Sequence, residues 1–314
     1  MALSGKKILV LGSSGMLAGD LIPSLERNSA DVELADLRQT GAFAHRIRSV
    51  DITDLAACKQ LLHELRPLWV VNCAAYTAVD QAETQYGPAL DVNAVGVANI
   101  AHAAREVHAN VVHFSTDYVF GGDSVSPEHG ATRAEARPHR EDDRRAPCGL
   151  YGHSKRLGED LLTALLPNNH LLLRTSWLHG VAGPNFVDTM LRLGKELPQL
   201  KVVNDQTGSP TWTGWLAQVT TKLLQKDVRG TYHASSRGGI TWYDFAREIF
   251  RQAGLTVDVQ PQSTAELGRP APRPKYSVLD VGKLEKVLGE VCISWQDCVS
   301  EHLRARGIEV KQHA

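Results

Sequence analysis

A tyrosine and a lysine four residues apart have the side chains needed for acid catalysis. Tyr151 and Lys155 lie at the start of a segment with helical spacing, so their side chains share one face. A phenol has an ordinary pKa of about 10, and a nearby ammonium group stabilises the phenolate and moves this pKa towards neutrality. Tyr151 would then be a usable proton donor. The alternative is a surface tyrosine that lies near a surface lysine.

A glycine-rich loop near the start of the chain has the pattern of a dinucleotide-binding turn. The sequence GSSGMLA at 12–18 follows the apolar run at 7–11 and leads into a helical pattern. Glycines permit a tight turn and close approach of the backbone to a pyrophosphate, and a helix N-terminus offers free N–H groups. The candidate cofactor contacts in this loop are Gly12, Gly15, Met16 and Leu17.

Charged residues after the second apolar run bear on the choice of cofactor. Asp36 ends the run at 32–36, where a carboxylate can bind the adenosine ribose hydroxyls. Asp36 favours NADH, whereas Arg38 could neutralise the 2′-phosphate of NADPH. The sequence therefore leaves both NADPH and NADH open.

Loops after later apolar runs supply further candidate cofactor contacts. Asp51 and Ile52 follow the third run, and Ala75, Tyr76 and Thr77 follow the fourth. These are the places where adenine and nicotinamide-ribose contacts are expected in a dinucleotide-binding sheet. The alternative for Asp51 is a cap on the helix expected from residue 55.

The elements that must position these residues alternate along the first half of the chain. Continuous apolar runs of strand length occur at 7–11, 32–36, 68–72, 111–115 and 171–176. Helical patterns lie between them at 16–25, 55–65, 90–107 and 154–166. This order predicts an α/β fold with a doubly wound, Rossmann-like parallel sheet. Ligands bind beyond the carboxyl ends of the strands in such a sheet, which is where the candidate residues stand.

The second half is less regular and indicates a smaller, interleaved substrate-binding lobe. Helical patterns are present at 186–194, 212–224 and 241–253. We expect residues 1–174 to form mainly the dinucleotide-binding domain, with sheet-completing segments from about 200–235, and residues 175–314 to form mainly the lobe. The charged segment 121–149 predicts an exposed loop, with a mobile flap over the site as the alternative.

Composition excludes several classes of function. The 314 residues carry a formal net charge of −1, which favours neither nucleic acid nor an anionic membrane. No stretch approaches the roughly 18 apolar residues of a membrane span, and no signal peptide is apparent, so we expect a cytoplasmic protein. The five cysteines form no CxxC pair and the 13 histidines no HExxH motif, which argues against a disulfide framework, a zinc site and a metal hydrolase.

Four further blocks, together with the glycine loop and the Tyr/Lys pair, carry a family resemblance. They are AAYTAVDQAE at 74–83, STDYVF at 115–120, RTSW at 174–177 and NDQTGSPT at 204–211. In this order they resemble signatures of the dTDP-4-dehydrorhamnose reductases, a family of the extended short-chain dehydrogenase/reductase superfamily. The resemblance implies reduction of the C4 ketone of dTDP-4-dehydro-L-rhamnose to dTDP-L-rhamnose with NADPH or NADH, in deoxysugar biosynthesis.

The resemblance also implies roles for the catalytic residues. Hydride would pass to the sugar C4 and Tyr151 would protonate the developing alkoxide. Thr116 would hydrogen-bond the same oxygen. Lys155 would hold the nicotinamide ribose while lowering the pKa of the tyrosine.

Three residues are candidate substrate contacts by the same resemblance. Asp117 and Trp177 would contact the sugar nucleotide, and Arg273, within a basic Arg-Pro stretch, is a candidate partner for its diphosphate. The alternatives are a turn role for Asp117 and core packing for Trp177.

The chain departs from the family pattern in two places. The loop between Phe120 and Tyr151 is longer than usual. Some members form a dimer through magnesium held by carboxylates, but here only Asp20 matches, with Gly214 and Ser294 at the other positions. A divalent ion needs several oxygen ligands, so we predict no metal site and a monomer.

Other functions on the same scaffold stay open. They are another nucleotide-sugar 4-ketoreductase, an epimerase, a 4,6-dehydratase or a non-catalytic nucleotide-binding regulatory subunit. Dehydratases place an Asp-Glu pair after the strand-end threonine, whereas Asp117 is followed by Tyr118. The presence of Thr116, Tyr151 and Lys155 together favours an enzyme.

Overall fold

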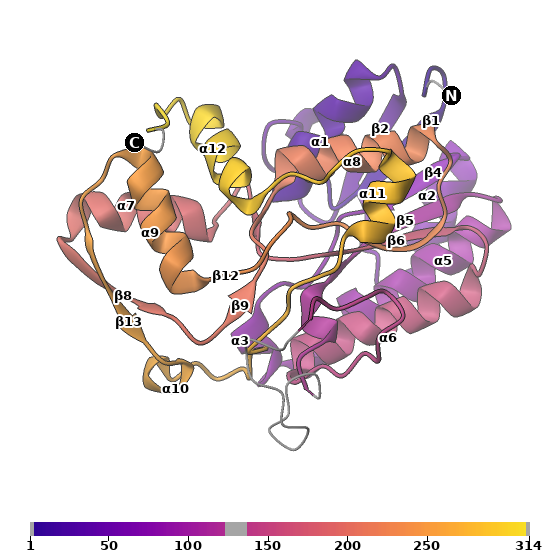
Figure 1. The fold of residues 1–314 in the computed structure, drawn as a ribbon. Coiled ribbons are helices and arrows are strands. Elements are labelled where there is room, and N and C mark those ends of the chain that lie inside the picture. Colours follow the sequence, from indigo (N-terminus) through magenta and orange to yellow (C-terminus); the bar gives the residue numbers. More distant parts are fainter. Residues whose placement is uncertain (1–2, 123–136, 312–314) are drawn as a thin grey trace.

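A seven-stranded parallel sheet forms the larger part of the molecule, and a smaller lobe lies beside it (Figure 1). The computed structural model describes residues 3–122 and 137–311. The part of the charged loop at 123–136 lies outside the described residues, so the loop-or-flap alternative stays a prediction there.

All the strand pairs of the large sheet are parallel, in the order β11-β6-β5-β4-β1-β2-β3. The strands are β1 (Lys7–Leu11), β2 (Asp31–Asp36), β3 (Ile47–Ser49), β4 (Trp69–Asn72), β5 (Asn110–Thr116), β6 (His170–Thr175) and β11 (Gly230–His233). The chain runs outward from β1 to β2 and β3 and then returns to β4 on the other side of β1. The carboxyl ends of β1 and β4 therefore flank the switch point where ligands bind in doubly wound sheets.

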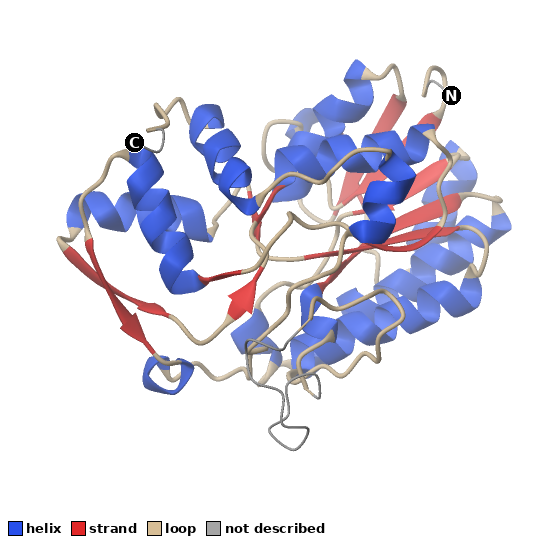
Figure 2. Cartoon of the chain, in the orientation of Figure 1, coloured by secondary structure: helices blue, strands red, loops and turns tan. Residues whose placement is uncertain are grey.

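Helices cover both faces of this sheet, which explains why its strands are continuously apolar (Figure 2). One face packs on α1 (Met16–Arg27), α8 (Thr213–Gln225) and α11 (Gly282–Leu288). The other packs on α2 (Leu55–Leu65), α5 (Gly96–Glu106) and α6 (Leu150–Leu165). The predicted α/β fold with a doubly wound parallel sheet is confirmed.

The helix expected at 90–107 begins with a π-helical turn, η2 (Asp91–Val95), and continues as α5. Two short helices, α3 (Val79–Ala82) and α4 (Tyr86–Leu90), precede it. Short 3₁₀ turns, η1 (Ala44–Arg46) and η3 (Asp117–Val119), follow β2 and β5. The π turn packs against α6, so the extra residue of this wider turn lies beside the helix that carries Tyr151.

The smaller lobe has its own apolar core, built around Val187, Phe245 and Ile249. Its elements are β7 (Leu178–His179), α7 (Phe186–Glu196), β8 (Gln199–Val203), β9 (Thr207–Gly208), β10 (Thr211–Trp212), β12 (Ile240–Thr241), α9 (Trp242–Ala253), β13 (Asp258–Gln262), α10 (Thr264–Leu267) and α12 (Trp295–Ala305). Between these segments the chain returns to the large sheet, where α8 packs along α1 and β11 pairs with β6. The exact division into two domains stays a prediction.

A helix that crosses a membrane must be long and predominantly apolar. Across residues 3–122 and 137–311, no helix has the length and apolar character that crossing a bilayer requires.

Candidate active site

The glycine loop turns sharply between β1 and α1. Gly12 has φ +71°, and a Cβ at this position would lie 2.4 Å from the backbone nitrogen of Ala74, so only glycine fits. Gly15 precedes Met16 as the N-cap of α1, and no side chain caps the helix there. Its first turn also lacks an acidic residue, so no carboxylate in the first turn of α1 offsets the N-terminal dipole.

Asp36 holds the glycine loop to the end of β2. Its carboxylate accepts hydrogen bonds from the backbone nitrogens of Ser14 at 2.9 Å and Arg38 at 3.2 Å. The Ser14 hydroxyl donates to the Arg38 carbonyl at 2.7 Å, and the Arg38 side chain is exposed. The structure thus brings together the predicted pyrophosphate loop and the two residues predicted to distinguish NADH from NADPH.

The loop after β3 shows whether Asp51 caps the helix α2. The cap of α2 is Asp54, whose carboxylate accepts from the backbone nitrogens of Ala56 and Ala57, so the interpretation of Asp51 as this cap is wrong. Asp51 instead accepts from the backbone and the hydroxyl of Thr53 at 2.9 and 2.7 Å. Ile52 is buried in the core between the large sheet and the helices α2, α5 and α6.

The segment at 75–77 is positioned by an asparagine that the sequence reasoning missed. Asn93, in the π turn, accepts from the backbone nitrogen of Tyr76 at 2.9 Å and donates to its carbonyl at 3.0 Å. The same amide nitrogen lies 3.0 Å from the Ser154 hydroxyl on α6. Ala75 and Thr77 are exposed. Asn93 therefore joins the predicted nicotinamide-ribose loop to the helix that carries Tyr151 and Lys155.

Tyr151 meets Thr116 where β5 ends. The Thr116 hydroxyl acts to lower the pKa of Tyr151, as a donor to the phenolate form would, and the Tyr151 ring packs edge-on against Tyr118 with centroids 5.7 Å apart. The N-terminus of α6 is held by Glu83, which accepts from the Leu150 backbone nitrogen at 2.7 Å. Burial raises the pKa of Tyr151 to about 12, so the phenol is protonated at neutral pH.

Lys155 points to β5. Its Nζ donates to the Phe114 carbonyl at 2.7 Å and lies 3.3 Å from Nε2 of His113. Burial lowers the pKa of Lys155 to about 8 and holds the pKa of His113 well below its ordinary value. The expected lowering of the Tyr151 pKa by Lys155 is therefore not what the structure shows: the ammonium group is directed to the strand, and burial raises the pKa of the phenol.

Asp117 is buried beneath this pair and contacts hydroxyl groups. Its carboxylate accepts from Thr116 at 3.1 Å, Ser176 at 2.9 Å and Ser277 at 2.5 Å. It lies at the start of the 3₁₀ turn η3, and its side chain has almost no exposed surface. Burial raises the pKa of Asp117 to about 6, an effect that the three hydroxyl donors oppose.

Trp177 lies at the border between the sheet and the lobe. Its ring stacks on Trp242 with centroids 3.4 Å apart and planes within 5°. Its backbone has φ +46°, and a Cβ on Gly208 would lie 2.4 Å from the indole. Trp177 is packed against the core of the lobe and keeps part of its surface exposed, so it combines packing with access to solvent.

Arg273 is already paired with a carboxylate. Its guanidinium donates to Asp80 at 2.8 Å and to the Ala271 carbonyl at 2.9 Å. Burial opposes ionisation of Asp80, but the hydrogen bonds from Arg273 and the Ala271 backbone lower its pKa overall. Arg273 also acts electrostatically on Tyr118, so its charge reaches the catalytic end of the site.

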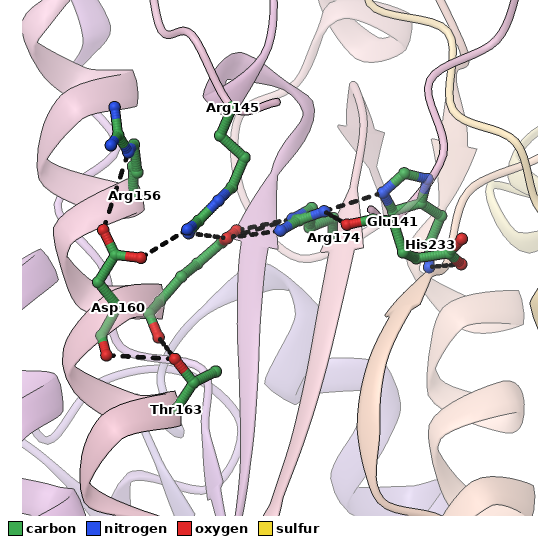
Figure 3. Close-up of polar contacts among 8 residues, drawn as sticks. Glu141, Arg145, Arg156, Asp160, Thr163, Arg174 and His233 are labelled. Carbon is green, nitrogen blue, oxygen red and sulfur yellow. Dashed lines mark hydrogen bonds and ion pairs between the residues drawn. The ribbon is translucent and has the colours of Figure 1, made fainter. Parts of the chain in front are cut away.

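A buried charge cluster beside the site was not predicted from the sequence (Figure 3). Glu159 on α6 accepts from Arg174 on β6 at 2.8 Å and from Arg145 at 2.9 Å. Arg174 also donates to the carbonyl of Glu141 at 3.0 Å. The block at 174–177 belongs to the family signature, and an arginine in a continuously apolar strand also signals a buried ionic partner.

The dinucleotide fits these residues. Gly12 forms a cradle that any Cβ would fill, and the uncapped N-terminus of α1 follows it. The buried Tyr76 hydroxyl has no hydrogen-bond partner among the described residues, at the place predicted for nicotinamide ribose. Gly12, Gly15 and Met16 are thus suited to hold a pyrophosphate.

The residues considered for magnesium serve other contacts. The Asp20 carboxylate accepts from the Thr213 hydroxyl at 2.5 Å, and Ser294 caps α12. Within the part of the chain that the structure describes, no group of three or more His, Cys, Asp or Glu side chains is arranged to hold a metal ion. The absence of a metal and the monomeric state stay predictions.

The glycine loop at the switch point and the Tyr/Lys helix beside the β5 threonine define the class: an NAD(P)-dependent oxidoreductase of the extended short-chain dehydrogenase/reductase type. Residues 6–307 match the family model described as the RmlD substrate binding domain, and the chain belongs to this family.

Three similar proteins agree with this membership. A dTDP-4-dehydrorhamnose reductase of Streptomyces griseus is 40% identical over 303 residues, 95% of this chain and 93% of the relative. A dTDP-4-keto-6-deoxy-D-glucose reductase of Streptomyces niveus is 36% identical over 86% of this chain and 87% of its own. The structure of a dTDP-4-dehydrorhamnose reductase of Bacillus anthracis in complex with NADP superposes with a TM-score of 0.84 at 36% identity, covering 96% of this chain and 99% of that one.

Proposed function

We propose that this protein reduces the C4 ketone of dTDP-4-dehydro-L-rhamnose to dTDP-L-rhamnose with NADPH or NADH. The observation that carries the proposal is the face of α6 that packs against the end of β5, where Thr116 acts on the Tyr151 phenol and buried Lys155 donates to the Phe114 carbonyl. It lies at the carboxyl edge of a sheet whose Gly12 loop suits a dinucleotide. Family membership and the named activity of the Streptomyces griseus relative support the substrate.

Tyr151 would supply the proton. The bound nicotinamide supplies a hydride to the carbonyl carbon. Burial keeps the phenol of Tyr151 protonated at neutral pH, which is the form an acid needs. As the ketone becomes an alcohol, the carbonyl oxygen gains this proton, and Tyr151 is left as a phenolate that recovers a proton from solvent.

Lys155 and Thr116 would position the reacting groups. Lys155 is buried next to the carboxyl end of β5, where its ammonium group could hold the nicotinamide ribose and stabilise the phenolate once it forms. Thr116 contacts Tyr151 and is our candidate for a second contact to the sugar oxygen.

The substrate contacts follow from the lobe and its border. The partly exposed Trp177 would contact the sugar nucleotide, and Asp117 lies behind the catalytic pair. Arg273 would bind the diphosphate, with Asp80 holding its guanidinium in place. We further propose that a monomer acts in the cytoplasm, which agrees with five cysteines that are all free.

A second candidate is another nucleotide-sugar 4-ketoreductase. The relative from Streptomyces niveus is named as a reductase of dTDP-4-keto-6-deoxy-D-glucose. The fold and the Tyr151 site serve both reactions, so the two are separated only by substrate.

The test is a coupled reduction followed by NAD(P)H absorbance. Purified protein is given dTDP-4-dehydro-6-deoxyglucose with or without a 3,5-epimerase, with Tyr151→Phe as the matched variant. We expect oxidation of cofactor only when the epimerase is present, and a rate about 10²–10⁴-fold lower for Tyr151→Phe. Equal oxidation without the epimerase would favour the second candidate, and none in either arm would refute both.

A further inference from the structure

A buried chain of polar side chains runs from the end of β4 through β5 to Lys155 on α6. The amide nitrogen Nδ2 of Asn72 lies 3.1 Å from Nδ1 of His113, and Nε2 of that ring lies 3.3 Å from Nζ of Lys155. Lys155 is held against the ring because its Nζ also donates to the Phe114 carbonyl at 2.7 Å. Asn72, His113 and Lys155 each have at most 2% of their surface exposed, so these polar atoms depend on one another for hydrogen bonds.

The loop that follows β4 fixes the orientation of the Asn72 amide. Its Oδ1 accepts from the backbone nitrogen of Ala74 at 3.0 Å, so Nδ2 is the atom that faces His113. An amide nitrogen carries only donors, and so does an ammonium group. Asn72 thus presents a donor to one ring nitrogen of His113, while the ammonium group of Lys155 presents a donor to the other.

The imidazole of His113 cannot accept a hydrogen bond from both sides. Burial and the charge of Lys155 hold the pKa of His113 well below its ordinary value, and a neutral imidazole has one donor and one acceptor nitrogen. One of the two donors that face the ring is therefore left unpaired while Lys155 is charged. When Lys155 loses its proton to solvent, its amine becomes an acceptor for Nε2–H of His113, and Nδ1 accepts from Asn72. The neutral amine thus satisfies every group in the chain.

We propose that Asn72 is a positioning residue that acts through His113: by presenting a donor to the ring, it disfavours the ammonium form of Lys155 and sets the pH above which that charge is lost. This inference rests on the proposed function, because the ammonium group is what would hold the nicotinamide ribose and stabilise the phenolate of Tyr151. Asn72 contributes to the reaction in this way without contacting the sugar.

The ionisable groups around Lys155 agree with this arrangement. Burial lowers the pKa of Lys155 to about 8, and the carboxylate of Glu159, one turn further along α6, opposes this effect. Glu159 is itself paired with Arg174 at 2.8 Å. Tyr151, one turn before Lys155, has a pKa of about 12 and is uncharged at neutral pH, as is His113 on β5. The unpaired donor therefore acts in the same direction as burial.

The first test follows the titration of Lys155 by NMR of the purified protein with isotope-labelled lysine, using Lys155→Met to assign the signal. Asn72→Leu removes the donor without adding a charge, and we expect the pKa of Lys155 to rise by about one pH unit, the size of one hydrogen bond. An apolar neighbour alone would lower the pKa of a buried lysine, so the direction separates the two effects. Asn110→Leu is the matched control, because Asn110 is also buried but donates to the Leu68 carbonyl. An unchanged or lowered pKa in Asn72→Leu, or an equal rise in Asn110→Leu, overturns the proposal.

The second test needs no change at Asn72. NMR with isotope-labelled histidine distinguishes a protonated ring nitrogen from a bare one, and the signals lost in His113→Phe assign this ring. Above the pH at which Lys155 titrates, we expect the His113 proton on Nε2, and a proton on Nδ1 contradicts the proposal.

The consequence for catalysis is measured in the pH profile of kcat for the sugar. In Asn72→Leu its alkaline limb should move up together with the pKa of Lys155, because the ammonium form persists to higher pH. An unmoved limb contradicts the proposal. If wild type reduces no sugar, the proposed function fails, while the two NMR measurements still decide the role of Asn72.

Discussion

Replacement of Glu159 by leucine should destabilise the protein strongly, because it leaves the buried Arg174 without a counter-charge, whereas the partly exposed Arg145 keeps its ion pair with Asp160. Glu159 has no exposed surface and accepts from Arg174 through Nε at 3.0 Å and Nη2 at 2.8 Å, and from Arg145 at 2.9 Å (Figure 3). Arg174 is only 4% exposed. Breaking a buried pair from one side typically costs about 3–5 kcal/mol, and we expect this loss in the free energy of unfolding.

A double variant separates the pair from the effect of burial alone. Glu159→Leu with Arg174→Met replaces both charges by apolar side chains, which is often close to neutral. We expect the losses in the free energy of unfolding of Glu159→Leu and Arg174→Met to sum to about 1–3 kcal/mol more than the loss in the double variant, measured by urea unfolding at pH 7.

A surface pair on α7 gives the matched control. Arg192 and Glu196 are 59% and 53% exposed and lie 2.8 Å apart, so Glu196→Leu should cost less than about 1 kcal/mol. Additive single changes at Glu159 and Arg174, with no coupling energy, would refute the reasoning. A loss at Glu159 no larger than that at Glu196 would do the same.

Three further predictions follow from the structure. Gly12→Ala should abolish NADPH binding in calorimetry, because its Cβ would lie 2.4 Å from the Ala74 backbone. Gly5→Ala is the control and should bind normally, because Gly5 has φ +70° but a Cβ there would have no atom within 4 Å. Equal loss of binding in both variants would show that backbone strain, not the contact, is responsible. Burial lowers the pKa of Lys155 in the folded protein to about 8, so the buried charged form destabilises wild type below that pH. Lys155→Met removes this penalty, and its melting temperature should exceed that of wild type by more at pH 7 than at pH 10. A difference in melting temperature that does not depend on pH would contradict this. Light scattering should give the mass of one chain with or without EDTA, and a doubled mass that EDTA halves would establish a metal-linked dimer.

The sheet was predictable because its strands are buried on both faces. The runs at 7–11 and 68–72 agree with β1 and β4 to within one residue, and α2 spans the range expected for it. The smaller lobe was less predictable, because strands such as β9 and β12 have two residues each and are defined by their partners in space. A pattern of period two needs more residues than these strands contain.

The site was predictable where a motif fixes the backbone, and less so where folding supplies the partner. Gly12 and the Tyr151–Lys155 spacing are local signals. Asn93, by contrast, acts through the Tyr76 peptide, 17 residues away, and lies in a π turn that helical spacing does not indicate. The contacts of Lys155 with β5 likewise depend on the packing of a helix on a strand.

The central claim is that hydride reaches C4 of the sugar while Tyr151 supplies the proton. NADPH deuterated on the transferred position, incubated with the protein, dTDP-4-dehydro-6-deoxyglucose and a 3,5-epimerase, allows the product to be examined by NMR. We predict one deuterium at C4 of dTDP-L-rhamnose and almost no labelled product with Tyr151→Phe. Deuterium at another carbon, or labelled product formed equally by Tyr151→Phe, would contradict the account.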